Sequence, residues 1–336
     1  MYGITESGIG LYSGKRFDKA YFCMEKAGNV SNAEKVKGCT RVLRDADVKF
    51  CFYELSGEES ILLLISVFTK ELSDAERAFA NFEEEIQEKG NPFGITIKGL
   101  TAEEKLSLMH RLIMADSPRA KIDVMQYLAK TSGWLPDFEL QHCQEKDRCL
   151  ITGNVHSSVM YIRRLPAEYA SVIYRTLKHT ECCRMLITTY EPVSEQEVMS
   201  QIQTNYMGFD TLLYKLKRKN VGIGKIVEEK PERRYLYAGI YFILSCKDFA
   251  RLEEEKEKLQ DILKKYGSEA VEYCFYQKEV LQKLSFLNPW TVQQMRLIQI
   301  QSAAGMNPFY QEDKEFDRDE MDEKSELLAA FDSIIS

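Results

Sequence analysis

The sequence Ile61-Leu-Leu-Leu-Ile-Ser-Val-Phe68 is the longest apolar run of the chain, and a helical pattern starts shortly after it at Ser73. A short continuous apolar run is typical of a strand buried on both faces of a sheet. Ser73 with Glu76 three residues later predicts an N-cap and a capping box, and Gly90 predicts the helix end. The apolar positions recur at helical spacing: Ala75, Phe79, Phe82 and Ile86. The stretch predicts a strand followed by a helix that packs on a sheet.

Short strands are predicted on both sides of this unit. They are Ile9–Tyr12, Ala20–Met24, Val48–Glu54 and Gly94–Ile97. A Ser-Gly-Lys-Arg turn separates the first two, which predicts a hairpin. Thr101 with Glu104 repeats the capping-box pattern and predicts another helix.

The same order of elements recurs near the carboxyl end. The predicted elements are a strand over Tyr237–Ser245, a helix from Asp248 to Gly267, a strand over Val271–Tyr276 and a helix over Glu279–Phe286. A shift of 177 residues superposes Leu72 on Phe249 and Gly90 on Gly267. The match indicates an internal duplication, although any two strand–helix–strand units share part of this periodicity.

Between the two copies, strands are predicted at Leu150–Thr152, Val159–Arg163 and Met185–Tyr190. Pro166 opens a predicted helix that ends near His179, and a long helix is predicted over 195–219. The fold class expected from these pieces is α+β, with ferredoxin-like split β-α-β units in mixed or antiparallel sheets covered by helices. A strictly alternating α/β fold with a parallel sheet is the competing class. The expected domains are 1–148, 149–310 and an acidic, partly helical tail over 311–336.

Composition and charge narrow the function classes. The 336 residues are 44% hydrophobic and 29% charged, which is ordinary for a globular protein. The tail holds ten acidic and three basic residues, and its net charge of −7 equals that of the whole chain. The rest of the chain is therefore neutral, which disfavours direct nucleic-acid binding. No apolar run reaches membrane-spanning length and no secretory signal is visible, so a cytoplasmic location is expected.

The nine cysteines predict free thiols, because the count is odd and no secretion signal is visible. The adjacent pair Cys182-Cys183 is expected in a strand, where the two side chains face opposite ways and serve packing. A zinc or enzymatic site is a weaker hypothesis, because it lacks the usual C-x-x-C spacing. Its candidate residues are His142, Cys143, Cys149 and His156.

Motifs for nucleotide binding and nucleophilic catalysis are missing from the sequence. A phosphate-binding loop requires G-x-x-x-x-G-K-[ST], whose glycines let backbone amides surround the phosphates. The Gly14-Lys15 and Gly224-Lys225 pairs are followed by Arg16 and Ile226, and both lack the first glycine. The chain also has no G-x-S-x-G and no H-E-x-x-H. No cofactor or metal is therefore expected.

Three places are candidates for contact with a partner. The basic cluster Lys215, Lys217, Arg218 and Lys219 suits an acidic or phosphate group, although a solvated helix end is the more common explanation. Pro308 and Phe309 end a connector of small residues that delivers an aromatic anchor to a neighbouring surface. Phe331 lies on an apolar helical face of the acidic tail.

The order of several segments resembles the amino-terminal domain of conjugative-transfer ATPases of type IV secretion systems, the CagE/TrbE/VirB family with its TraE- and TrsE-like members. The segments that carry the resemblance are Gly99–His110, Tyr161–Pro166, Tyr214–Lys219, Tyr241–Gln260, Tyr276–Leu281 and Gln301–Phe309. Their order carries the resemblance, since no single motif is specific.

In that family an ATPase domain with Walker motifs follows the Pro-Phe connector, whereas here an acidic stretch follows it. The leading hypothesis is therefore a non-catalytic scaffold or adaptor of a conjugation machine. The alternative is the amino-terminal part of an intact conjugation ATPase that energises transfer. The helical pattern of the acidic ending favours a complete short protein. The implied partners are other conjugation or secretion proteins, including membrane-embedded ones that would hold the chain at the inner face of the cell membrane; self-association is left open.

Overall fold

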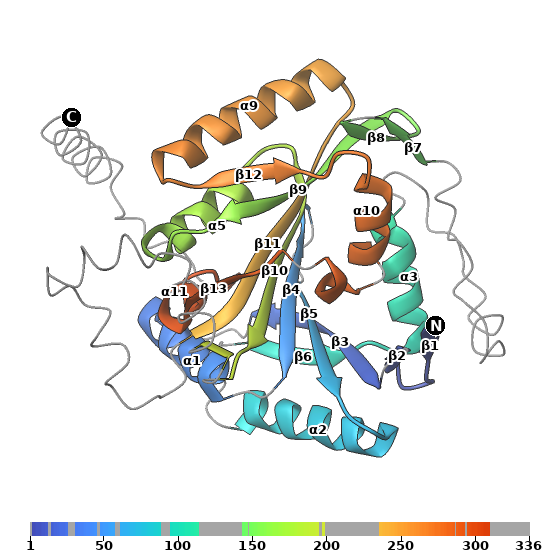
Figure 1. Ribbon diagram of the computed structural model, residues 1–336. Helices are drawn as coiled ribbons and strands as arrows, with labels where there is room; N and C mark the ends of the chain where they lie inside the picture. Colours follow the sequence, from blue (N-terminus) through green and yellow to red (C-terminus); the bar gives the residue numbers. More distant parts are fainter. Residues whose placement is uncertain are drawn as a thin grey trace, which may run out of the picture.

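The strands of the described residues join one sheet in which every neighbouring pair is antiparallel (Figure 1). The structure is a computed structural model. It describes residues 2–309 except 13–14, 26–30, 46–47, 58–60, 89–94, 114–142, 147, 195–196, 199–234, 286 and 293. Helices cover the sheet on both faces, so the fold class is α+β, as predicted.

The first half of the described chain contributes six strands and three helices. They are β1 (Tyr2–Ile4), β2 (Gly10–Tyr12), β3 (Arg16–Glu25), α1 (Asn32–Asp45), β4 (Lys49–Leu55), β5 (Ile61–Phe68), α2 (Leu72–Glu88), β6 (Ile95–Gly99) and α3 (Ala102–Ile113). The predicted hairpin is confirmed, because β2 pairs with β3 from Tyr12 opposite Arg16. Strand β5 is the predicted apolar run, and it is buried on both faces.

The second half repeats this order of strands and long helices. Its elements are β7 (Cys143–Lys146), β8 (Cys149–Thr152), β9 (Val155–Arg164), η2 (Ala167–Tyr169), α5 (Ala170–Lys178), β10 (Cys183–Pro192), β11 (Tyr235–Cys246), α9 (Phe249–Lys265), β12 (Glu269–Glu272) and α10 (Gln277–Ser285). Helices α2 and α9 both have 17 residues, and they start 177 residues apart, at Leu72 and Phe249. A closing segment follows, with η4 (Pro289–Thr291), β13 (Arg296–Gln299) and α11 (Ile300–Ala304).

The two halves arrange their strands in the same spatial order. In the first half the order is β6-β3-β5-β4, and in the second it is β12-β9-β11-β10. The hairpins β1–β2 and β7–β8 extend β3 and β9 in the same way. The halves meet where β4 pairs with β10, with Phe52 opposite Thr188. One sheet therefore runs through both halves.

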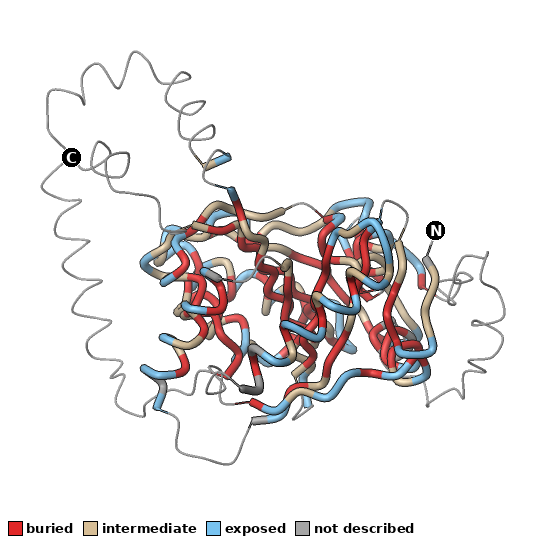
Figure 2. Tube along the Cα trace, turned by 90° about the horizontal axis from the view of Figure 1, so that it is seen from below, coloured by how far each residue is buried: buried red, intermediate tan, exposed pale blue. Residues whose placement is uncertain are grey.

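The sheet separates two apolar cores. On its first face, helices α1, α2, α5, α9 and α11 cover one core, and on its second face α3, α10 and η4 cover the other. Figure 2 shows buried residues along the central strands and exposed residues along the outer turns of the helices. Strands sealed on both faces need almost continuous apolar sequence, which explains the runs in β5 and β11.

Two of the three predicted helix N-caps are confirmed. Thr101 and Glu104 form the capping box, since the Thr101 amide donates to Glu104 Oε2 at 2.9 Å and the Glu104 amide donates to Thr101 Oγ1 at 3.2 Å. Asp248 caps α9 by accepting from the Ala250 amide at 3.0 Å. The predicted cap at Ser73 is wrong. Helix α2 begins one residue earlier, at Leu72, whose side chain packs on the first core.

The expectation that all cysteines are free is also wrong for two of them. Cys182 and Cys246 form a disulfide with a Cα–Cα distance of 6.1 Å. Cys182 lies in the turn before β10 and not within a strand, and both it and Cys183 face the first core. Pairing between β10 and β11 brings Cys246 close to Cys182. The spacing of the cysteines in the sequence does not predict this disulfide.

Candidate functional site

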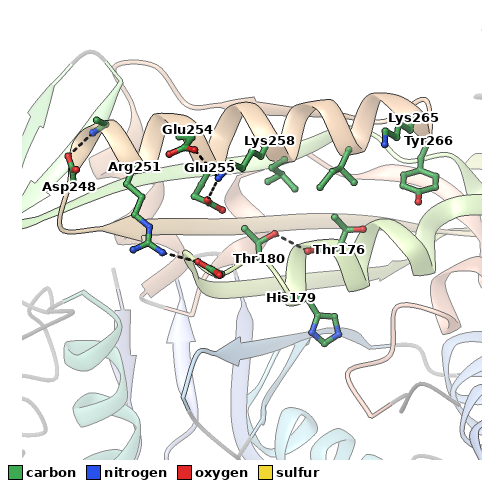
Figure 3. Close-up of a pocket in the computed structure, with 14 residues that line it drawn as sticks. Thr176, His179, Thr180, Asp248, Arg251, Glu254, Glu255, Lys258, Lys265 and Tyr266 are labelled. Carbon is green, nitrogen blue, oxygen red and sulfur yellow. Dashed lines mark hydrogen bonds and ion pairs between the residues drawn. The ribbon is translucent and has the colours of Figure 1, made fainter. Parts of the chain in front are cut away.

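An open groove of about 1110 Å³ lies between helices α5 and α9 on the first face of the sheet. Figure 3 shows α9 along one wall and the end of α5 along the other. Thr176, His179 and Thr180 come from the α5 side, whereas Arg251, Glu255 and Lys258 are among those from α9. The groove is long and open, which suits an extended ligand better than a small enclosed one.

The charges along the groove are largely compensated by each other. Arg251 Nη2 lies 2.8 Å from Glu181 Oε2, and this ion pair crosses from one wall to the other at one end. Lys258 Nζ lies 3.0 Å from a carboxylate oxygen of both Glu254 and Glu255. The hydrogen bonds that Lys258 donates to these two carboxylates raise its pKa. The groove therefore presents charges of both signs and no strong field of one sign.

Apolar side chains also line part of the groove. Leu259 is buried at the base, whereas the Ile262 side chain is 39% exposed within the groove. At the end opposite to Glu181, the rings of Tyr169 and Tyr266 lie 5.5 Å apart. An exposed Ile between charged groups offers apolar contact area together with polar anchors, which is the combination that protein interfaces use.

A second ionic cluster holds α9 in place from beneath. Lys256 is almost fully buried, and its Nζ lies 2.6 Å from Glu253 Oε1 and 2.8 Å from Glu272 Oε1. Glu272 also accepts a hydrogen bond from Ser158 Oγ at 2.5 Å. Because Glu272 ends β12 and Ser158 lies in β9, this network fixes the α9 wall of the groove to the sheet.

A buried charge cluster lies on the second face, in the first half. Asp18 and Lys105 are both 0% exposed. Lys105 Nζ donates to the carbonyl oxygens of Gly8 and Asp18, both at 3.3 Å, and Arg16 Nη2 lies 3.4 Å from Asp18 Oδ2. Burial raises the pKa of Asp18 and lowers the pKa of Lys105 to about 8. Because Asp18 and Lys105 are fully buried, the cluster belongs to the packing of the interior.

Of the partner-contact candidates predicted from the sequence, Pro308 and Phe309 lie in the described part of the chain, and neither lines this groove. Lys215, Lys217, Arg218, Lys219 and Phe331 lie outside the described residues, as does the helix predicted over 195–219.

The Pro308–Phe309 anchor reaches a surface of the chain itself and not of a partner. Phe309 is 4% exposed and packs edge-on against Phe52, with ring centroids 5.8 Å apart. Lys35 and Lys178 donate hydrogen bonds to the carbonyl oxygens of Phe309 and Pro308, both at 3.1 Å. Phe309 is therefore not exposed for contact with a partner, and it ties the closing segment to α1, α5 and β4.

The proposed His/Cys cluster does not form among the described residues. Cys143 belongs to the core of the second face and Cys149 to the core of the first face, so the sheet separates them. His156 faces Phe249, with ring centroids 5.6 Å apart, and His142 lies outside the described residues. In the described part of the chain, His, Cys, Asp and Glu form no group that could hold a metal ion.

Sequence reasoning missed the groove because its walls come from helices more than seventy residues apart. The local signals were present, since Pro166 and Asp248 mark the helix starts. The sequence does not reveal how close α5 and α9 lie, because that distance depends on which strands pair. A search for exposed apolar residues within polar helix faces would have singled out Ile262.

Comparisons with known proteins give only weak similarities. No family model matches the sequence, and no curated protein matches it. Among solved structures, CrmK, a flavoenzyme involved in shunt product recycling in caerulomycin biosynthesis, has 10% identity and a TM-score of 0.31 over 75% of this chain and 42% of its own. Aspartate kinase from Synechocystis has 12% identity and a TM-score of 0.20 over 83% of this chain and 51% of its own.

An anthrone oxidase-like protein has 10% identity and a TM-score of 0.20, over 70% of this chain and 94% of its own. This chain thus spans about half or less of the first two structures. At these TM-scores, neither the fold nor the activity of the three is carried over to this chain. No helix in the described residues is long and apolar enough to cross a membrane.

Proposed function

We propose that this protein is a non-catalytic scaffold or adaptor of a conjugative-transfer machine, and that the α5–α9 groove holds a segment of a partner protein. The assignment to such a machine rests on the segment order over Gly99–Phe309 in the sequence. The assignment to docking rests on the groove. In this proposal the chain lies in the cytoplasm, and its partners include membrane-embedded components that hold it at the inner face of the cell membrane.

The architecture supports a duplicated, ferredoxin-like origin for the two halves. A split β-α-β unit of this kind places its four strands in the spatial order 4-1-3-2. The orders β6-β3-β5-β4 and β12-β9-β11-β10 follow that rule, with β3 and β9 as the first strands. The equal lengths of α2 and α9 and their 177-residue offset add to this support.

The chemistry of the groove is the single observation that favours a polypeptide partner. A nucleic acid or a nucleotide needs a concentration of positive charge or a backbone cradle. Here Arg251 and Lys258 are already paired with acidic side chains, and Ile262 is exposed one helical turn beyond Lys258. A partner segment with apolar residues flanked by charges of both signs fits this lining.

Mutation of the exposed apolar residue tests the docking role. Each protein encoded by a neighbouring gene is co-expressed singly with the chain, and binding is measured by co-purification and then by calorimetry. We expect one partner to bind, with affinity at least about tenfold weaker for Ile262→Arg because a charge replaces apolar contact area. Met24→Arg is the control, since Met24 is also an exposed apolar residue but lies in β3. Equal binding by wild type and Ile262→Arg would refute the groove as the docking site.

An activity assay tests the non-catalytic part of the proposal. The purified 336-residue chain should hydrolyse ATP no faster than the buffer background, because the sequence has no G-x-x-x-x-G-K-[ST]. Robust turnover that a single substitution abolishes would contradict it. The alternative, an amino-terminal domain of a conjugation ATPase, is checked by reading the coding sequence downstream of residue 336 for that motif.

A further inference from the structure

We propose that the Cys182–Cys246 disulfide is a reversible clamp that fixes one end of the α5–α9 groove. Thiol reductants would break the disulfide and release this end. The inference deepens the proposed function, because it assigns regulation to the same groove. No sequence motif predicts this disulfide. Its oxidation and reduction can be measured in the absence of a partner protein.

The two cysteines lie at the points where the groove walls join the sheet. Cys182 immediately follows Glu181 in the turn between α5 and β10, and Cys246 ends β11 two residues before the α9 cap Asp248. Glu181 and Asp248 both line the groove. The Cα–Cα distance of 6.1 Å lies within the range that a disulfide spans. The bond therefore connects the end of one wall to the start of the other.

Non-covalent contacts at this end are weak by comparison. The Glu181–Arg251 ion pair at 2.8 Å joins two exposed side chains, so water and salt screen it. The Ser245 amide donates to the Cys182 carbonyl at 2.8 Å, which keeps the strand ends together. The turn at Glu181 and the first turn of α9 are each held by local hydrogen bonds, from the Cys183 amide to the Thr180 carbonyl at 2.9 Å and from the Ala250 amide to Asp248 at 3.0 Å. Neither of these two bonds joins the turn to the helix. Reduction should therefore loosen the groove end while the sheet stays paired.

The redox step is ordinary thiol–disulfide exchange with glutathione as co-reactant. A glutathione thiolate attacks one sulfur of the Cys182–Cys246 bond, which forms a mixed disulfide and releases the other cysteine as a thiolate that takes up a proton. A second glutathione thiolate then attacks the glutathione sulfur of the mixed disulfide and displaces the remaining protein cysteine as a thiolate, which takes up a proton. The products are two protein thiols and one glutathione disulfide. The reverse sequence consumes glutathione disulfide and closes the clamp.

The surroundings of the two cysteines favour two states, one with the disulfide formed and one with both thiols free. Cys182, Cys183 and Cys246 are each 8% exposed and lie at the edge of the first core, whereas Cys23 and Cys51 are fully buried. Burial raises the pKa of Cys183 to about 12, so it stays a thiol and does not attack its neighbour. In the cytoplasm, where the proposed function places the chain, a disulfide of this kind is characteristically transient.

The test equilibrates the full chain in glutathione buffers of graded oxidation, traps free thiols by alkylation, and maps them by mass spectrometry. We expect a cross-linked Cys182–Cys246 peptide to replace two alkylated peptides as glutathione disulfide increases. Hydrogen exchange at Glu181–Cys182 and at Lys247–Arg251 should be about tenfold faster in the reduced chain. Cys182→Ser should show the faster exchange in every buffer, whereas Cys274→Ser, which removes an exposed free thiol, should behave as wild type.

The result separates the clamp from the docking role. If Cys182 and Cys246 are alkylated separately at every ratio, or if exchange is the same in both states, the clamp is refuted and the docking proposal is untouched. If the bond forms and breaks with the expected change in exchange while no partner binds, the clamp stands and the docking proposal fails.

Discussion

At the scale of single residues, Lys105 and Asp18 are the least expected feature of the interior. A buried charge costs free energy unless a partner and hydrogen bonds compensate it. Lys105 meets this need through two carbonyl oxygens and the nearby Asp18. At the position of β9 that corresponds to Asp18, the second half has the apolar Val159, so it has no buried charge to compensate there. The sequence could not predict the pair, because neither residue shows local periodicity that distinguishes it from a surface charge.

Removing one member of the pair should destabilise the fold more than removing both. Lys105→Met leaves the buried Asp18 carboxylate with Arg16 but without the Lys105 ammonium, so we expect the free energy of unfolding to fall by ~3 kcal/mol. Adding Asp18→Val should restore most of that loss. Urea denaturation measures both, with Lys37→Met on the exposed side of α1 as the control. A double variant as unstable as the single one would contradict this account.

The pH dependence of stability should carry the signature of Lys105. Burial lowers its pKa to about 8 in the native chain, against an ordinary value of 10.5. Between these values the unfolded chain holds the proton and the native chain does not, so the contribution of Lys105 to stability rises with pH. The difference in unfolding free energy between wild type and Lys105→Met should therefore grow in favour of wild type from about pH 7.5 to pH 9.5. A constant or shrinking difference would be inconsistent with this.

At the scale of elements, strands and helices with strong periodicity were predictable from sequence. The β5 run and the α9 pattern needed no knowledge of distant residues, since burial on both faces and the Asp248 cap are both local signals. The start of α2 was not predicted correctly. Serine is a residue type that favours the N-cap position, but Ser73 lies inside the helix, which begins at Leu72. There the apolar contact of Leu72 with the core extends the helix beyond the expected cap.

Substitution of the two serine/threonine candidates separates a true cap from an apparent one. Thr101→Ala removes the side chain that accepts from the Glu104 amide, so the free energy of unfolding should fall by ~1 kcal/mol. Ser73→Ala should change it by less than ~0.5 kcal/mol, because Ser73 already lies inside α2. Thermal and urea denaturation of both variants give the comparison. A larger effect at Ser73 than at Thr101 would show that the sequence-based cap was correct.

At the scale of the whole molecule, pairing between β4 and β10 joins the two halves. Sequence alone indicated separate units over 1–148 and 149–310, because it does not reveal which edge strands meet. The continuous ladder from Phe50–Tyr190 to Leu55–Met185 gives the halves a shared sheet. The closing segment adds to the connection, since Phe309 packs on Phe52 of the first half.

A shared sheet should make unfolding of both halves cooperative. In a Trp134→Phe background, fluorescence of Trp290 reports the second half, whereas far-ultraviolet circular dichroism reports the helices of both. We expect the two urea transitions to coincide, because neither half can unfold without exposing the β4–β10 edge. Two separated transitions would indicate that the halves are independent domains.

Site-specific photo-crosslinking in cells that carry the transfer machine tests the docking role most directly. A photoreactive amino acid replaces Lys258, which faces the groove, and in a matched control it replaces Asn81, the exposed residue 177 positions earlier on α2. We predict a single crosslinked band from position 258 that mass spectrometry identifies as a component of the transfer machine, and no such band from position 81. Equal crosslinking at both positions, or none at 258, would contradict docking in the groove.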